Sequence, residues 1–165
     1  MPRRQDRYRE EPNRERYPMN RRHFFFSAAA LMAVPAAALA GKPQIFTRNG
    51  AALSGYDAVS YFSGGPKKGA DEFSTKWKGA TWRFSSADNL AAFKANPQNY
   101  APQYGGYCAF AVANGVTAPA DPKAYHIRSG KLYVNLSPAV LARWKQDIPG
   151  FVASANQNWP KVLNK

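Results

Sequence analysis

The sequence is poor in the side chains that hold metals or act as nucleophiles. It has one cysteine, Cys108, and two histidines, His23 and His126, and its three methionines all lie in the first 32 residues. After residue 40 the chain therefore has no thioether for Cu(I), no second cysteine for a disulfide and too few ligands for a Cys₄, Cys₂His₂ or His₃ zinc site. A metal bound there would rest on Cys108 and His126 with oxygen ligands, and a Ser-His-Asp triad would have to use His126.

Acidic residues are also few. Residues 41–165 hold 6 acidic and 15 basic side chains, which gives them a net charge of +9. Such a surplus favours contact with anionic surfaces, for example lipid headgroups or polyanionic cell-wall material. The lysines are scattered and form no single run, so we expect a solvated surface with at most peripheral contact with anionic surfaces.

Long apolar runs are limited to one near the N-terminus. Arg21-Arg22 precedes an apolar run that extends to Leu39 and closes with Ala38-Leu39-Ala40. A charged lead, a short apolar stretch and an A-x-A ending are typical of a cleavable signal peptide, and the paired arginines resemble the twin-arginine type. The run is interrupted by Pro35 and is shorter than the ~20 residues that span hydrocarbon.

These features divide the chain into a twin-arginine-type signal peptide, residues 1–40, and one domain, residues 41–165. We expect the mature protein to be periplasmic or secreted after cleavage near Ala40. The alternative is a protein anchored in the membrane by an uncleaved signal. In this compartment nucleic acid is not an expected partner. The 125 residues that remain suit one small domain with one core.

Turn signals and alternating side chains predict two β-hairpins. Residues 73–77 and 80–84 alternate aromatic with polar residues on either side of Lys78-Gly79. Residues 125–128 and 131–134 flank Ser129-Gly130 in the same way. The residues before them, 41–54, are expected to be an extended entry segment.

Three helical stretches accompany the hairpins. Ser86 is a predicted N-cap for a helix through Phe93, which Asn96-Pro97 ends. Ser137-Pro138 is a predicted start for a second helix, and a third runs from Phe151 to near Trp159-Pro160. The predicted fold class is a small α+β domain, in which two hairpins form an antiparallel sheet packed by about three short helices.

Four segments carry a resemblance to a known family. They read GYDAVSYF (55–62), WKGATWRFSS (77–86), AAFKANPQNYAPQYGGYCAFAVANG (91–115) and SGKLYVN (129–135). The combination of an aromatic-Ser-Ser before the helix, F-x-x-x-P-x-x-Y after it, and YGGYCA resembles a YHS domain in its exported single-domain form. The resemblance places the YHS core at about residues 55–108 and assigns the rest to a C-terminal hairpin and helical extension.

The resemblance also implies what has been lost. The metal-associated branch of the YHS family carries one cysteine after an Asp-Pro-Val turn and two more in the pattern F-C-S-x-x-C-x-x-x-F. In this chain those three positions hold Ser60, Ser85 and Asn89. A hydroxyl or amide does not replace a thiolate as a soft-metal ligand. The resemblance thus implies that the chain keeps the YHS fold but has lost the cysteines that bind metal in that branch.

The candidate binding residues cluster around the tyrosines and the single cysteine. They are Tyr56, Asp57, Tyr104, Tyr107 and Cys108. Cys108 is either a reactive thiol or a small buried residue, and burial protects a lone thiol in an oxidising compartment. His126 alternates with Ile127 on a hairpin, which predicts that one of the two faces solvent.

These observations leave three functional hypotheses. The first is a non-catalytic binding or accessory module of the cell envelope, with an aromatic surface around Tyr104, Tyr107 and Cys108 for a small molecule or a protein segment. The second is a copper or zinc handler, or a handler of a metal cofactor, that uses Cys108 and His126. The third is a thiol enzyme or redox sensor that uses Cys108. No cofactor is predicted, although a metal ion remains open, and no base–nucleophile pair favours an enzyme.

Overall fold

The β3–β4 hairpin is the first large element of the structure, a computed structural model that describes residues 41–165. Strand β3 (Ala70–Trp77) pairs antiparallel with β4 (Ala80–Phe84). The two turn residues, Lys78 and Gly79, have φ values of 48° and 76°, which match the twist of the flanking strands. The hairpin predicted around Lys78-Gly79 is confirmed, and β3 begins three residues earlier than expected.

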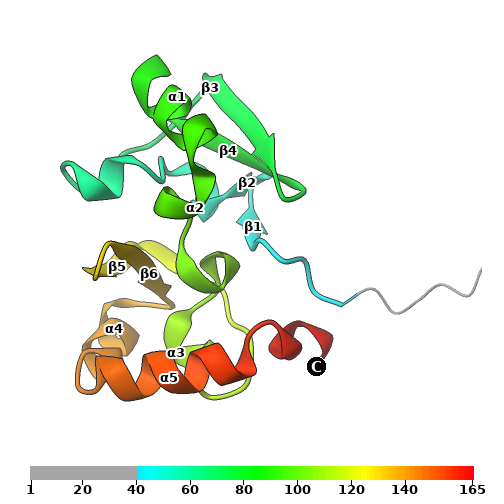
Figure 1. Cartoon of the computed structure of the whole chain (residues 1–165), viewed down its shortest axis with the longest axis vertical. Helices are drawn as coiled ribbons and strands as arrows, with labels where there is room; N and C mark the ends of the chain where they lie inside the picture. Colours follow the sequence, from blue (N-terminus) through cyan, green and yellow to red (C-terminus); the bar gives the residue numbers. More distant parts are fainter. Residues whose placement is uncertain (1–40) are drawn as a thin grey trace, which may run out of the picture. The chain divides into compact units, whose positions relative to one another are not determined.

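Helix α1 (Ala87–Ala95) follows β4 and covers the hairpin (Figure 1). Its N-cap is Ser86, whose Oγ accepts a hydrogen bond from the Asn89 backbone N–H at 3.2 Å. Phe93 is the buried residue of this helix and lies against Trp82 and Phe84, with ring centroids 4.9 Å apart in both pairs. The predicted N-cap is therefore confirmed, and the short helix α2 (Pro97–Tyr100) begins directly after Asn96.

The second predicted hairpin is also confirmed. Strand β5 (Asp121–Arg128) pairs antiparallel with β6 (Lys131–Asn135). Both residues of its turn, Ser129 and Gly130, have positive φ values, 49° and 69°, as in the first hairpin. Strand β5 is longer than predicted, because it begins at Asp121 and carries an irregularity before Tyr125.

Both faces of the β5–β6 hairpin are covered (Figure 1). Successive residues of a strand point to opposite faces. Leu132 and Val134 accordingly belong to one buried cluster, with β3, β4 and α1, whereas Tyr133 belongs to a second cluster with the C-terminal helices. The hairpin is thus the layer between two hydrophobic clusters.

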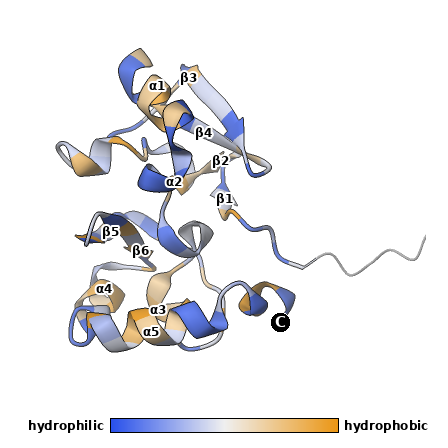
Figure 2. Ribbon diagram, viewed as in Figure 1, coloured by the Kyte–Doolittle hydropathy of each residue, from blue (hydrophilic) through white to orange (hydrophobic). Residues whose placement is uncertain are grey.

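Three helices build the second cluster. They are α3 (Ala109–Ala113), α4 (Pro138–Trp144) and α5 (Ile148–Asn158). Helix α4 has the predicted Ser137 cap, whereas α5 begins three residues before the predicted Phe151 because the Asp147 carboxylate caps it. Helices α3 and α5 pack together, and their facing stretches are mainly hydrophobic (Figure 2).

The expected extended entry segment contains a short hairpin. Strand β1 (Thr47–Arg48) pairs with β2 (Ala51–Ala52), and the 3₁₀ turn η1 (Leu53–Gly55) follows. Lys42 donates its backbone N–H to Leu163 O at 2.8 Å, so the segment before β1 lies against the last turn of the chain, η4 (Lys161–Asn164).

The predicted α+β class is confirmed, with a different arrangement of strands. Residues 41–165 form five α-helices and three separate two-stranded antiparallel sheets. The two predicted hairpins do not pair with each other, because hydrophobic side chains from both fill the space between them. No helix among these residues is long and apolar enough to cross a membrane. The predicted signal peptide lies outside the described residues.

Candidate functional site

Asp57 is a fully buried carboxylate that accepts five hydrogen bonds. Its Oδ1 accepts the backbone N–H groups of Val59 at 2.8 Å and Ser60 at 3.2 Å. Its Oδ2 accepts the backbone N–H and the hydroxyl of Ser85, at 2.9 and 2.7 Å, and the Asn89 amide at 2.6 Å. The segment after η1 is thereby tied to the end of β4 and the start of α1. Asp57 therefore has a structural role, because its carboxylate holds these segments together.

The three residues that stand at the expected thiolate positions meet at this carboxylate. Ser85 and Asn89 bond Asp57 directly, and Asn89 also lies 3.3 Å from the Ser85 hydroxyl. Ser60 donates its hydroxyl to the Asp57 carbonyl oxygen at 2.8 Å. Every lone-pair direction of the carboxylate thus faces a donor. This arrangement does not fit a metal ion, because the only charged oxygens are already occupied by N–H and O–H groups.

Cys108 is 1% exposed and lies at the start of α3. Its sulfur accepts the Leu136 backbone N–H at 3.3 Å and lies 3.8 Å from the Asn135 side-chain oxygen. Asn135 is itself buried and accepts the Phe110 backbone N–H at 3.1 Å. The thiol therefore joins α3 to the end of β6. A reactive thiol needs an accessible sulfur, which this position does not provide.

His126, on strand β5, packs against an aromatic residue of the second cluster. Its ring meets the buried ring of Trp144 edge-on, with centroids 5.7 Å apart. Burial lowers its pKa below the usual value, and the cations of Lys145 and Arg128 lower it further. His126 and Ile127 are both half-buried, so the pair does not divide into one buried and one solvent-facing residue as predicted.

The structure forms no hydrogen bond between Cys108 and His126. Within residues 41–165, no three His, Cys, Asp or Glu side chains come together as a possible metal-binding group. Each of the two residues has its own packing partners on a different element. Cys108 and His126 are therefore not part of one such group within the described residues.

The tyrosines from the predicted site have separate surroundings. Tyr104 donates its hydroxyl to Asn156 at 3.0 Å, and Tyr107 donates to Pro43 O at 2.9 Å. Burial raises the pKa of both phenols. Tyr56 lies elsewhere, under the Lys68 ammonium, which is 4.1 Å from its ring centroid. Tyr104 borders a cavity, whereas Tyr107 and Cys108 are not among the residues that line it.

This cavity has a volume of about 170 Å³ and is open to solvent. It lies where the turn of the β3–β4 hairpin approaches the segment 44–45, the stretch 98–105 and Trp159. Its walls combine aromatic rings, three glutamine amides and one lysine. The lining residues are Gln44, Ile45, Trp77, Lys78, Gln98, Ala101, Pro102, Gln103, Tyr104, Gly105 and Trp159.

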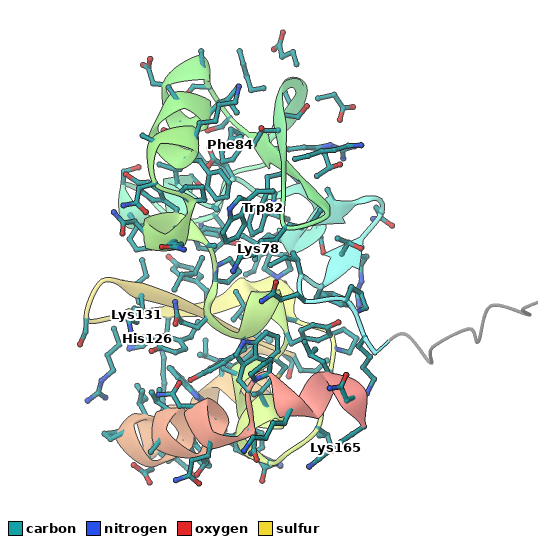
Figure 3. The ribbon with its side chains drawn as sticks, turned by 45° about the vertical axis from the view of Figure 1, so that its right-hand side comes forward. Lys78, Trp82, Phe84, His126, Lys131 and Lys165 are labelled. Carbon is teal, nitrogen blue, oxygen red and sulfur yellow. The ribbon has the colours of Figure 1, made fainter. Side chains whose placement is uncertain are left out.

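Trp77 and Lys78 reach the cavity from the first cluster. The Trp77 ring meets the rings of Trp82 and Phe93 edge-on at 5.7 and 5.8 Å, which fixes it at the end of β3. Lys78 places its ammonium 4.7 Å from the Trp77 ring centroid. Figure 3 shows Lys78 at the end of the hairpin, below Trp82 and Phe84.

Trp159 and Gly105 form the other side. The Trp159 ring packs against Tyr104 and Tyr107, with ring centroids 6.1 Å apart in both pairs. Gly105 has a φ of 63° and lies so close to the Gln44 carbonyl that a Cβ atom would collide with it. Its carbonyl accepts the Phe46 backbone N–H at 2.9 Å. A glycine here lets the entry segment run along the cavity wall.

No family model, curated protein or solved structure matches this chain. Of the predicted binding residues, the structure brings Tyr104 to the cavity. Sequence reasoning missed Trp77, Lys78, Gln98, Gln103 and Trp159 as lining residues. The Lys78-Gly79 turn was the sequence signal that could have identified two of them. It places the exposed residue Lys78 next to Trp77 at the end of a strand.

Proposed function

We propose that this protein is a non-catalytic binding module of the cell envelope, and that the cavity beside Tyr104 takes its ligand. The observation that carries the proposal is the cavity wall. Trp77 and Trp159 offer flat apolar surfaces, and three glutamines offer both donors and acceptors. Binding sites typically pair apolar and aromatic walls with a few polar groups that fix orientation.

The cavity wall also favours binding over chemistry. Lys78 and Tyr104 are its titratable residues, and the Tyr104 hydroxyl is engaged with Asn156. General acid–base catalysis needs a group that can release and accept a proton near the working pH. Burial raises the pKa of Tyr104, so its phenol stays protonated at neutral pH.

We also propose that the domain is a YHS domain whose metal-thiolate positions have become a hydrogen-bond network. Support comes from Ser60, Ser85 and Asn89, which are as far as 29 positions apart in the sequence and yet gather around Asp57. Residues that once shared a metal would be expected to lie this close together. In this proposal the Asp57 carboxylate holds the fold where thiolates and metal would otherwise do so.

The proposal is tested by a binding screen on the purified chain. Soluble envelope fragments, namely sugars, amino sugars, short peptides and lipid headgroups, are screened by calorimetry or ligand-observed NMR. We expect at least one class to bind, and we expect Gln98→Ala to weaken that binding several-fold because Gln98 lines the cavity.

The matched control is Gln157→Ala. Gln157 is an exposed glutamine on α5 and does not line the cavity, so its replacement is expected to leave the affinity unchanged. Binding that both variants weaken equally, or a screen with no reproducible ligand, would contradict the proposed site.

A further inference from the structure

A second cavity lies next to the first and also borders the entry segment. It has a volume of about 360 Å³ and shares Gln44 with the first cavity. Pro160, which lines it, follows Trp159 of the first cavity directly in the chain. Its lining residues are Gly41, Lys42, Gln44, Pro160, Lys161, Leu163 and Asn164. We treat the two cavities, which share the wall residue Gln44, as one binding surface and call it the Gln44 groove.

The charges along the Gln44 groove have one sign. Lys78 lies in the first cavity, and Lys42 and Lys161 lie in the second. Lys42 donates its ammonium to Lys165 O at 2.9 Å, which leaves Lys78 and Lys161 as the cations offered to a ligand. Neither set of lining residues includes an aspartate or a glutamate. A surface with a free lysine in each cavity and no aspartate or glutamate among its lining residues is complementary to an elongated anion.

The remaining lining residues indicate what kind of anion would fit. Trp77, Trp159 and Pro160 provide flat apolar surfaces, against which the C–H face of a sugar ring can pack. Gln44, Gln98 and Asn164 provide amides, which can donate to and accept from hydroxyl groups. The first cavity holds the volume of about five or six water molecules, which suits one sugar ring. The second is about twice as large.

We propose that the Gln44 groove binds a linear acidic glycan, with a sugar ring on Trp159 and carboxylates at Lys78 and Lys161. The inference rests on the proposed binding function and names its ligand class. An acidic peptide is the less favoured occupant, because several glutamine and asparagine amides suit hydroxyl-rich rings better than a chain whose polar groups are mainly backbone amides.

The test uses three defined probes: tetragalacturonate, the neutral maltotetraose and tetraglutamate. Calorimetry at low and moderate salt measures their affinity for the purified chain and its variants. We expect tetragalacturonate to bind most tightly and to weaken as salt is raised. Lys78→Gln and Lys161→Gln should each weaken it about fivefold, the loss of one charge-assisted contact worth about 1 kcal/mol.

Lys131→Gln is the matched control, because Lys131 is an exposed lysine beside the turn of the other hairpin and does not line the groove (Figure 3). It should change the affinity less than twofold. Glutamine keeps most of the length of the lysine side chain. At position 78, where φ is positive, glutamine and lysine have a similar backbone strain. The comparison therefore isolates the charge.

Four results would overturn the inference while the proposed function stands. If maltotetraose bound as tightly as tetragalacturonate, the ligand would not need to be acidic. If tetraglutamate bound more tightly, a peptide would be the favoured ligand. If Lys131→Gln weakened binding as much as Lys78→Gln and Lys161→Gln, the net charge of the protein would explain the loss of affinity. Absence of tetragalacturonate binding, with another ligand found in the envelope screen, would also overturn it. Failure of both experiments would overturn the binding function itself.

Discussion

At the scale of single residues, Asp57 has the clearest predicted role in stability. Asp57→Asn replaces one acceptor oxygen by an NH₂ group, which would then face N–H and O–H donors. Because a buried polar group without a partner is costly, we expect the free energy of unfolding to fall by about 3 kcal/mol. Urea denaturation followed by circular dichroism measures this change.

Ser85→Ala is the control for that substitution. It removes one hydroxyl donor but keeps the Ser85 backbone N–H bond to the carboxylate. The expected loss is about 1 kcal/mol, typical of one hydrogen bond. If Asp57→Asn cost no more than Ser85→Ala, the central role of the carboxylate would be wrong.

His126 predicts a pH dependence of stability. Its pKa in the folded chain is lowered from 6.5, so the unfolded chain binds the proton more tightly. The contribution of His126 to stability should therefore be fully present above about pH 6.5. It should be lost progressively as the pH drops from there toward the lower pKa of the folded chain. His126→Gln, which does not titrate, should show a smaller fall between about pH 7.5 and about pH 5.5 in urea denaturation. Equal pH profiles for the two chains would refute the prediction.

At the scale of elements, the close approach of Gly105 to the entry segment is testable. In Gly105→Ala the new Cβ would collide with the Gln44 carbonyl, and φ is 63°. We expect a loss of about 2 kcal/mol or more in unfolding free energy, together with weaker ligand binding, because the segment at Gln44 along the cavity must shift.

Gly130→Ala separates the two causes of that loss. Gly130 has a φ of 69°, similar to Gly105, but nothing lies within 4 Å of the position its Cβ would take. It should cost only about 1 kcal/mol, the penalty of the left-handed backbone alone. Equal losses in thermal or urea denaturation of both variants would show that close packing at Gly105 contributes nothing.

Much of the element structure followed from local sequence. The turns Lys78-Gly79 and Ser129-Gly130 and the caps Ser86 and Ser137 depend on residues adjacent in the chain, so they could be predicted. The Asp147 cap of α5 was missed, although Asp147-Ile148-Pro149 carries the same cap-and-proline signal as Ser137-Pro138. The site was harder, because Trp77, Gln103 and Trp159 meet only through tertiary packing.

At the scale of the whole domain, the β5–β6 hairpin links two hydrophobic clusters. Leu132 packs on one side of it and Tyr133 on the other. Because neither cluster is complete without the hairpin, we expect residues 41–165 to unfold in one cooperative transition. Leu132→Ala should lower the free energy of unfolding by about 2–5 kcal/mol and keep a single transition.

Tryptophan fluorescence and far-ultraviolet circular dichroism provide the measurement. Trp82 reports on the first cluster and Trp144 on the second, and both are buried. Coincident transitions from the two methods support one cooperative unit. Two separate transitions, with only the first shifted by Leu132→Ala, would mean that the clusters unfold independently.

The covered hairpin also has a kinetic consequence for its backbone amides. Residues 132–134 are buried on strand β6, and hydrophobic clusters pack against both faces of the hairpin. Amides in such a position exchange with solvent deuterium only when the structure opens globally. The exchange rates along β6 should therefore be the slowest in the domain, and they would report its full stability under native conditions without any denaturant.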